Sequence, residues 1–320
     1  MKRLTVVAVL AVVSACAKPK PPTTLANWQP PQPPAGMRMT LISGASIVAP
    51  ESDAIAGGDS KKKITMPIVM ALVRHPKGTV LIDSAFGRNH ERHIEEFPAN
   101  LFQKLMKPSF DAKKDPAVVQ LAALGIASED VDYLLVTHMH WDHIGGLGDF
   151  PQASLVTPRA EWDAAHRGDL TLSVRGYADS MYDKLHPAAM LLEWPDRPFG
   201  TFERSIDFFG DGSIVLIDTR GHTAGSMSIL VSLPTGERFL FTGDASWLRR
   251  GYREHKHKGW KTRLLDNSRR GVMPTLDRID ALEKLAPDVK IVPAHDPEVW
   301  AELKHAPYWY GEPAVPAISP

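Results

Sequence analysis

The 320-residue chain has little cysteine and no excess of either charge. Cys16 is the single cysteine, so no disulfide can form within the chain. A metal site elsewhere in the chain must therefore use nitrogen and oxygen ligands. The balance of 37 basic and 37 acidic side chains argues against a general nucleic-acid-binding protein. Beyond the N-terminus, no run is long and apolar enough to cross a bilayer as a helix. What is left is a globular chain whose hydrophobic content of 43% can fill a sizeable core.

The N-terminus is typical of an exported bacterial lipoprotein. A basic start, Met1-Lys2-Arg3, precedes an apolar run from Leu4 to Val13 that is too short to span a membrane. The run ends in Val13-Ser14-Ala15-Cys16, which resembles a lipobox; an ordinary secretory signal cleaved at small residues is the alternative. We expect a signal peptide over residues 1–16, lipidation of Cys16, and a location in the cell envelope, on the periplasmic face of the outer membrane.

Proline content and apolar patterning divide the remaining chain. Residues 17–36 are rich in proline and lack apolar periodicity, so they predict a semi-rigid tether. A single folded domain is expected over residues 37–320. Two groups of strands, each followed by helices, predict a layered α/β fold with sheets inside and helices outside. The expected strands are 39–48, 64–74, 79–82, 133–136, 155–156, 213–217, 226–232, 239–241 and 289–292, and the expected helices lie within 99–124 and at 159–166 and 276–285.

A cluster of histidine and aspartate follows the strand expected at 133–136. His138, His140, Asp142 and His143 lie within six residues, and burying them without partners would be costly. A divalent metal satisfies all four, because imidazole and carboxylate are ordinary zinc ligands. Residues two apart share one side of an extended chain, so the first three should face one way, while His143 suits a second metal. Gly145-Gly146 is expected to allow a sharp turn through backbone angles that other residues avoid.

Three further polar residues stand where expected strands end. They are His222, Asp244 and His295. Each is a weak signal alone, since such a histidine is more often structural, but together with the cluster they form a strong one.

In this set of seven residues the chain resembles the metallo-β-lactamase superfamily, over about residues 40–300. The resemblance implies an α/β fold, the αβ/βα four-layer sandwich, with the site at one edge of the sheets. It implies two divalent ions, zinc first and iron, manganese or cobalt as alternatives, and hydrolysis by a hydroxide held between them. Asp142 would also accept a proton, and Asp83 would orient a ligand histidine or cap a turn. The implied ligands of one ion are His138, His140 and His222, those of the other are Asp142, His143 and His295, and Asp244 bridges both.

Residues between these positions favour the N-acyl-homoserine lactonase branch. Asp244-Ala245-Ser246 and Ala294-His295-Asp296 are similar to that branch, and Trp141 suits its pattern. True β-lactamases usually lack the bridging aspartate. One departure is Trp247, where many lactonases carry a tyrosine, because an indole donates one hydrogen bond but cannot relay a proton. We expect Trp247 to form an apolar wall for an acyl chain, with packing in the core as the alternative.

The resemblance thus predicts a quorum-quenching lactonase that acts on a small-molecule substrate. A phosphodiesterase or another esterase of the same fold is the alternative, and a β-lactamase or a non-catalytic binding protein is disfavoured. A lipid-anchored membrane protein is expected, nucleic acid is not an expected partner, and a homodimer is left open.

The stretch from Arg249 to Arg270 is strongly basic. A solvated surface is expected for most of its charges; a lid that favours anionic substrates or approaches anionic lipid headgroups is the alternative. His255 and His257 lie within it, and we expect them, like His90 and His93, to be surface residues rather than ligands.

Overall fold

The structure is a computed structural model that describes residues 21–28, 31–96, 108–167, 175–182 and 189–312. The expected signal peptide, with Cys16, lies outside the described residues, as do residues 17–20 of the expected tether. Within the described ranges, no helix combines the length and apolarity needed to cross a membrane.

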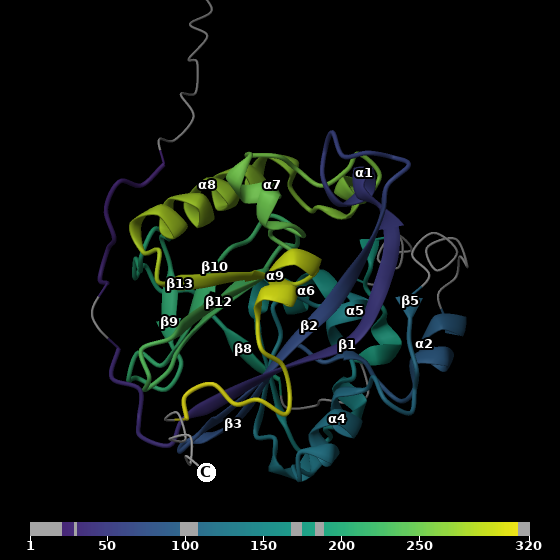
Figure 1. The fold of residues 1–320 in the computed structure, drawn as a ribbon, viewed down its shortest axis with the longest axis vertical. Coiled ribbons are helices and arrows are strands. Elements are labelled where there is room, and N and C mark those ends of the chain that lie inside the picture. The colour runs from purple at the N-terminus through teal and green to yellow at the C-terminus, as the bar shows by residue number, and fades with distance from the viewer. Residues whose placement is uncertain (1–20, 29–30, 97–107, 168–174, 183–188, 313–320) are drawn as a thin grey trace, which may run out of the picture.

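Two β-sheets face each other at the centre of the molecule (Figure 1). In chain order the strands are β1 (Arg38–Pro50), β2 (Lys63–His75), β3 (Gly78–Ile82), β4 (Ala85–Phe86), β5 (Pro108–Ser109), β6 (Tyr133–Leu135), β7 (Ser154–Pro158), β8 (Met190–Leu192), β9 (Ser205–Asp207), β10 (Ile214–Asp218), β11 (Met227–Ser232), β12 (Arg238–Gly243) and β13 (Val289–Pro293). The first sheet has the order β5-β1-β2-β3-β6-β7-β8 and the second β13-β12-β11-β10-β9. Both are mixed: β3, β6, β7 and β8 pair in parallel, as do β12 and β13, and the other pairs are antiparallel.

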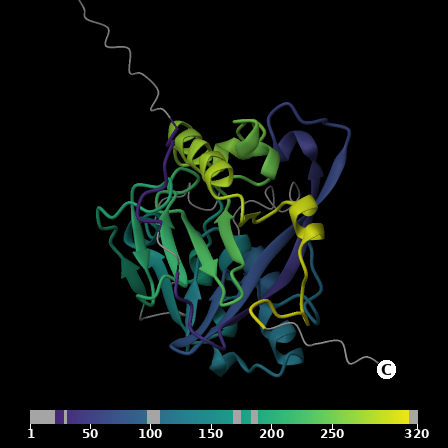
Figure 2. The same ribbon diagram turned by 60° about the vertical axis from the view of Figure 1, so that its left-hand side comes forward.

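Helices lie mainly outside the sheets (Figures 1 and 2). The α-helices are α1 (Glu51–Ala54), α2 (His90–Glu96), α4 (Ala117–Ala123), α5 (Trp141–Ile144), α6 (Arg159–Ala165), α7 (Arg249–Arg253), α8 (Arg269–Leu285) and α9 (Pro297–Glu302). Short 3-10 turns are η1 (Ser128–Asp130), η2 (Leu147–Asp149), η4 (Asp179–Met181) and η5 (Thr262–Leu265). The 17-residue α8 begins at a capped end, because the Ser268 hydroxyl accepts from the Gly271 N–H.

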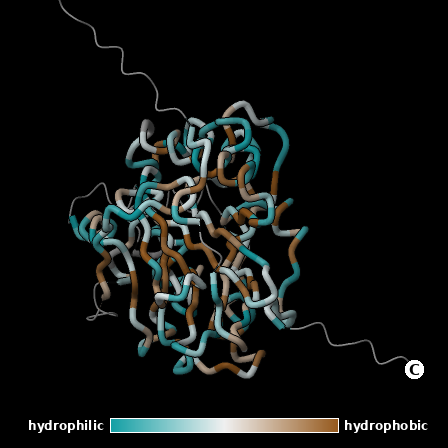
Figure 3. The backbone as a smooth tube through the Cα atoms, turned by 90° about the vertical axis from the view of Figure 1, so that its left-hand side faces the viewer, coloured by the Kyte–Doolittle hydropathy of each residue, from teal (hydrophilic) through white to brown (hydrophobic). Residues whose placement is uncertain are grey.

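Apolar side chains fill the space between the sheets. Val73, Val80 and Leu135 of the first sheet pack with Ile229 and Phe239 of the second, all fully buried. Figure 3 shows the apolar stretches gathered inside and the polar stretches at the periphery. This core stabilises the fold, since burying one such side chain contributes about 1.5–3 kcal/mol.

The outer faces of both sheets are covered by helices. Leu72 of β2 alternates with Val73 and packs on the other side, in the cluster that includes Leu121 of α4 and Ile144 of α5. On the second sheet, Leu276 of α8 packs with Leu240. The expected αβ/βα four-layer sandwich is therefore confirmed. The centre of each strand predicted from an apolar run lies within two residues of the centre of an observed strand. Helix α4 lies in the stretch 99–124 that was expected to hold short helices, and residues 99–107 of that stretch are outside the described part.

The expected tether differs from the expectation where it is described. Ala26 donates its N–H to Gly200 O at 2.8 Å, and the ring of Trp28 packs on Phe199 with centroids 5.2 Å apart. Gln32 then donates its N–H to Asp211 O. The packed chain begins ahead of the expected boundary at Met37, because aromatic and backbone contacts fix a segment that has no apolar periodicity.

Candidate metal centre

Seven buried polar side chains converge where strands of both sheets end. His138 and His140 follow β6, and Asp142 and His143 lie on α5. His222 stands in the turn after β10, Asp244 follows β12, and His295 follows β13. None is more than 7% exposed, although all seven are polar. The sequence-predicted ligands are thus all brought to one place.

The local backbone differs from the expected extended chain. His140 is the last extended residue, and α5 begins at the next position. On a helix, neighbouring residues are separated by about 100°, so Asp142 and His143 can both face one point, whereas on a strand they would point to opposite sides. The prediction that Asp142 continues the alternation of His138 and His140 is therefore wrong.

Gly145 and Gly146 also act differently from the prediction. Their φ angles are −59° and −90°, which other residues adopt readily. Glycine is required at Gly146 because a Cβ there would lie 2.4 Å from Ser84 O. The pair lets α5 approach the chain around β4 closely instead of making an unusual turn.

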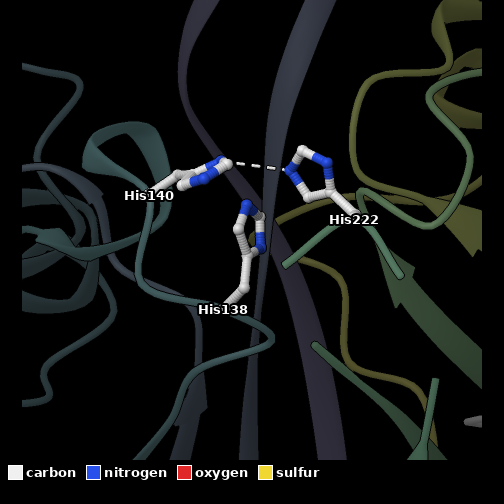
Figure 4. A group of neighbouring side chains, drawn as sticks. All are labelled: His138, His140 and His222. Carbon is white, nitrogen blue, oxygen red and sulfur yellow. Dashed lines mark hydrogen bonds between the residues drawn. The ribbon is translucent and has the colours of Figure 1, made fainter. Parts of the chain in front are cut away.

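Three histidines form the first group. Figure 4 shows the rings of His138, His140 and His222 pointing toward a common region between the two sheets. Each offers a nitrogen within 4.8 Å of the others. His140 Nδ1 and His222 Nε2 are 3.0 Å apart. Two nitrogens this close together could bind the same ion.

Asp142, His143 and His295 form the second group. Asp142 Oδ2 lies 3.5 Å from His295 Nε2 and 3.8 Å from His143 Nε2. Asp244 stands between the groups: its Oδ1 is 3.0 Å from His295 Nε2 and 3.3 Å from His143 Nε2. Its Oδ2 is 3.4 Å from His222 Nε2. One carboxylate oxygen therefore faces each group, as a bridging ligand must.

The buried atoms of the centre fit a pair of cations. Nε2 of His138, His143 and His295 and Oδ1 of Asp244 are buried with no hydrogen-bond partner among the described residues. Such atoms are costly unless something else binds them. Burial and the neighbouring imidazoles lower the pKa values of His138 and His140 well below the usual value, so these rings are neutral and have a lone pair to donate.

Carboxylates dominate the other half of the centre. Burial opposes a charge on His143, but Asp142 and Asp83 outweigh it and raise the pKa of His143 well above its usual value. Burial likewise opposes a charge on Asp244, yet His295 and His143 hold its pKa well below the usual range. The site favours positive charge at this position, which a divalent ion would supply.

Asp83 orients one of these rings. Its Oδ2 accepts from His143 Nδ1 at 2.8 Å, and its Oδ1 accepts from the Thr137 N–H at 2.7 Å. Holding Nδ1 as the donor leaves Nε2 free to face the centre. Asp83 was expected to orient a ligand histidine or to cap a turn, and the structure places it in contact with His143.

Lys258 and Asp266 were not predicted, and they sit behind His222. Asp266 Oδ1 accepts from His222 Nδ1 at 2.8 Å and from Lys258 Nζ at 2.7 Å, with both charged side chains no more than 3% exposed. Burial would raise the pKa of Asp266, but Lys258 and His222 lower it to about 2. Nothing in the sequence separates these two charges from the other charges of the basic stretch.

Glu161 was also missed, and it joins two ligand loops. Its Oε1 accepts from the Met139 N–H at 2.8 Å and from the Tyr177 hydroxyl at 3.2 Å. Its Oε2 accepts from the Gly225 N–H at 2.9 Å. Met139 lies between His138 and His140, and Gly225 lies three residues after His222. This fully buried carboxylate therefore fixes the distance between the two loops that carry these histidines.

The two tryptophans expected in a substrate pocket are both buried. Trp247 donates its Nε1–H to Asp244 Oδ2 at 2.5 Å and meets His295 edge to face, with centroids 5.4 Å apart. Trp141 stacks on Phe86 with centroids 4.9 Å apart. At 3% and 4% exposed, they offer little surface to an acyl chain, and Trp247 uses its donor on a ligand.

The basic stretch is largely neutralised by ion pairs. Its recorded pairs are Arg249–Glu302, Arg250–Glu51, Arg250–Glu254, Arg253–Glu283, Lys256–Glu254, Lys258–Asp266 and Lys261–Asp53. The side chains of Arg269 and Arg270 lie outside the described part. His255 is exposed, as expected, and pairs with Asp277.

The expectation that His90 and His93 are surface residues is wrong. They are 5% and 6% exposed. His90 packs against Phe86 with ring centroids 4.1 Å apart, and burial lowers its pKa to about 4. An imidazole on a short helix is buried here because aromatic neighbours cover it.

A buried set of histidines and aspartates that can hold two ions, at the edge of two facing sheets, defines a metal-dependent hydrolase. The chain belongs to the metallo-beta-lactamase superfamily, whose family model matches residues 65–295.

Known relatives and structures agree with this membership. The N-acyl homoserine lactonase AttM of Rhizobium radiobacter is 30% identical over 253 residues, covering 77% of this chain and 88% of that protein. The probable metallo-hydrolase Rv2300c of Mycobacterium tuberculosis is 31% identical over 240 residues, covering 72% and 74%. A structure of an N-acyl homoserine lactone hydrolase with N-hexanoyl-L-homoserine at its catalytic metal centre superposes with a TM-score of 0.69 at 18% identity, covering 85% of this chain and 98% of that one.

Proposed function

We propose that this chain opens the ring of N-acyl-homoserine lactones by hydrolysis. The observation that carries the proposal is Asp244, whose two oxygens face two separate ligand groups in a chain related to AttM. The basic stretch, which would have favoured an anionic phosphodiester, is mostly paired with carboxylates. A phosphodiesterase is therefore the weaker alternative.

The residues of the centre divide the work of the reaction. His138, His140 and His222 would hold one divalent ion, and Asp142, His143 and His295 the other, with zinc suited to both. When bound, such ions polarise a carbonyl oxygen and lower the pKa of water from about 15.7 toward 7. Asp142 is the more exposed of the two carboxylates at the centre, with 10% of its side chain accessible against 3% for Asp244.

The greater exposure of Asp142 supports a role for it in handling protons on the open side. Ring opening adds water across the C–O bond of the lactone ring. The water oxygen joins the lactone carbonyl carbon, and the ring oxygen leaves as an alcohol. Asp142 would accept the proton that water releases and return it to the departing oxygen. The product is the open N-acyl-homoserine, with no other reactant consumed.

A substrate panel tests the proposal. We expect purified protein to hydrolyse N-hexanoyl-homoserine lactone faster than a phosphodiester, a thioester or a β-lactam, and to lose that activity with a chelator. Turnover and metal content are measured on the same preparation. Faster turnover of the phosphodiester than of any lactone would overturn it.

Trp247 supplies a further prediction. Trp247→Phe keeps the ring against His295 but removes the hydrogen bond to Asp244. Losing a bond to a charged acceptor costs about 1.5–3 kcal/mol, so kcat/KM for the lactone should fall roughly tenfold or more. Trp300→Phe, on α9, is the matched control. Unchanged kinetics in Trp247→Phe would show that this bond does not support the reaction.

From the ion pair of Lys258 and Asp266 behind His222, we expect that one variant loses only one of the two metal ions. Asp266→Asn removes the charge that Lys258 and His222 share, and losing such a partner typically lowers metal affinity by about 10–100-fold. Only one ligand group includes His222, so dialysed protein should retain about one ion fewer per chain, measured by mass spectrometry of the metals. Asp277→Asn, which alters the exposed pair with His255, is the control. Full retention of both ions would contradict the positioning role.

We also propose that the protein is exported and lipid-anchored through Cys16, on the strength of the lipobox alone. In a diderm bacterium, Cys16→Ser should move the protein from salt-washed membranes to the soluble fraction. Labelled palmitate should enter the unaltered chain and not the variant. Equal membrane retention and no label in either chain would contradict anchoring.

A further inference from the structure

The segment from His257 to Asp266 has two different sides. Lys258 and Asp266 turn inward to His222, as described above. Trp260 and Leu264 turn outward and are 68% and 59% exposed, more than any other large apolar side chain in the described part of the chain. Exposed apolar side chains that are grouped, unlike scattered ones, mark an interaction surface.

Trp260 and Leu264 are exposed on the same short helical turn. The Arg263 N–H donates to Gly259 O at 2.9 Å, so the backbone from Gly259 into η5 is helical. The Leu264 N–H donates to Lys261 O at 3.1 Å, so this is a tight 3-10 turn that keeps Trp260 and Leu264 within roughly 8 Å of each other along its axis. The two side chains therefore form one apolar patch.

Neighbouring backbone holds this turn in place. Asp53 O accepts from the Gly259 N–H at 3.0 Å and from the Thr262 hydroxyl at 2.5 Å, and the Ala56 N–H donates to His257 O at 2.8 Å. A Cβ at Gly259 would lie 1.9 Å from Ser52 O, so only glycine allows this approach. The patch is displayed on a fixed support next to the loop that follows α1.

Basic side chains flank the patch. Lys61 and Lys62 are exposed on the adjoining loop and Lys63 is exposed at the start of β2, and Lys261 lies 5.9 Å from the Trp260 ring. Lys62 pairs with Glu51 and Lys261 lies 3.8 Å from Asp53, while within the described ranges no ion pair to a carboxylate is recorded for Lys61 or Lys63. The exposed Asp59 is the acidic neighbour that opposes them.

The patch lies at a distinct end of the molecule. In Figures 1 and 2 the described N-terminal segment 21–28 begins beside α8, at the same end as α7 and α1. Chain that precedes this segment therefore joins the domain at the end that carries the patch.

We propose that the face formed by residues 51–63 and 256–265 docks on the surface of a bilayer that contains anionic phospholipids. An exposed tryptophan beside a leucine and lysines is the combination that interfacial surfaces use, because indole favours the headgroup region and lysine attracts anionic lipid. The segment that contacts lipid is the one that contacts His222, so docking holds the metal centre close to the membrane. The inference does not depend on which bond the centre hydrolyses.

Lipid-borne quenchers test this contact in the full chain. The protein is reconstituted with vesicles of phosphatidylcholine and phosphatidylglycerol at 3:1, with and without brominated phosphatidylcholine, and tryptophan fluorescence is recorded. Bromine quenches only at close range, so we expect quenching in the unaltered chain and loss of more than half of it in Trp260→Phe. Trp300→Phe, a half-buried tryptophan on α9, should keep the full quenching.

Two further comparisons keep the proposal falsifiable. Leu264→Ser should lower the quenching at least twofold. Met190→Ser, which alters a side chain that is 44% exposed on β8, should leave it unchanged. Vesicles of phosphatidylcholine alone should give severalfold less quenching than vesicles that contain phosphatidylglycerol. No quenching, or equal quenching in Trp260→Phe, would overturn the proposal. So would a dimer in sedimentation that Trp260→Phe dissociates without any lipid quenching, because the face would then bind a second copy. Lactone turnover in lipid-free buffer should be unchanged in Trp260→Phe, which separates this test from that of the proposed function.

Discussion

Asp244→Asn should retain fewer than two ions per chain and lose lactone turnover by roughly 10³-fold or more. The amide keeps the shape of the side chain but removes the one negative charge that lies between both ligand groups. Two cations held in one buried site would repel each other strongly without this charge, because screening there is weak. The Trp247 N–H, which donates to Oδ2, would also face a neutral partner.

Metal content after dialysis and kcat/KM are the measurements for this variant. Asp163→Asn, an exposed carboxylate on α6, is the matched control and should change neither. Melting temperatures taken with a chelator separate a folding defect from a defect in metal binding. A variant that kept both ions and full turnover would rule out the bridging role of Asp244.

Glu161→Gln should lower the free energy of unfolding by about 2–3 kcal/mol and weaken metal binding as well. The carboxylate accepts from Met139 N, Gly225 N and the Tyr177 hydroxyl, and it is fully buried. A glutamine can accept only through its single oxygen, so its amide group would oppose one of these donors. The two ligand loops would then separate, although no ligand is altered.

Denaturant unfolding with and without a chelator measures both effects of this substitution. Bound metal adds to the stability of the folded state, so the gap between the two curves reports metal binding. Tyr177→Phe, which removes one of three donors, should give a smaller change in the same direction. Equal unfolding curves for Glu161→Gln and the unaltered chain would show that Glu161 does not join the loops.

The residues that converge at the centre could be predicted from the sequence, and the residues that support them could not. His138 to His143 form a contiguous run of metal-binding residue types, and the other ligands follow apolar strands that patterning reveals. Asp83, Glu161 and Asp266 contact ligand loops that are 60, 22 and 44 residues away. No local pattern encodes such pairs, because only the packing of the two sheets brings them together.

Short elements and single contacts account for the other differences. The four residues of α5 are too few to show helical periodicity, so an extended chain was the natural expectation there. The ring of Trp28 and a few backbone hydrogen bonds fix a proline-rich segment to the domain, and composition carries no sign of these contacts. His90 is buried by aromatic neighbours that include Phe110, which is distant in sequence.

Each ligand group takes two members from the chain before residue 144 and its third from the chain after residue 221. Neither half of the polypeptide carries a complete set, so a chain that has emerged from the ribosome only as far as residue 221 cannot hold either ion firmly. Tight retention of metal is therefore a property of the assembled tertiary structure alone. Ion uptake can serve as a direct readout of correct folding, and any event that parts the two sheets should release both ions together.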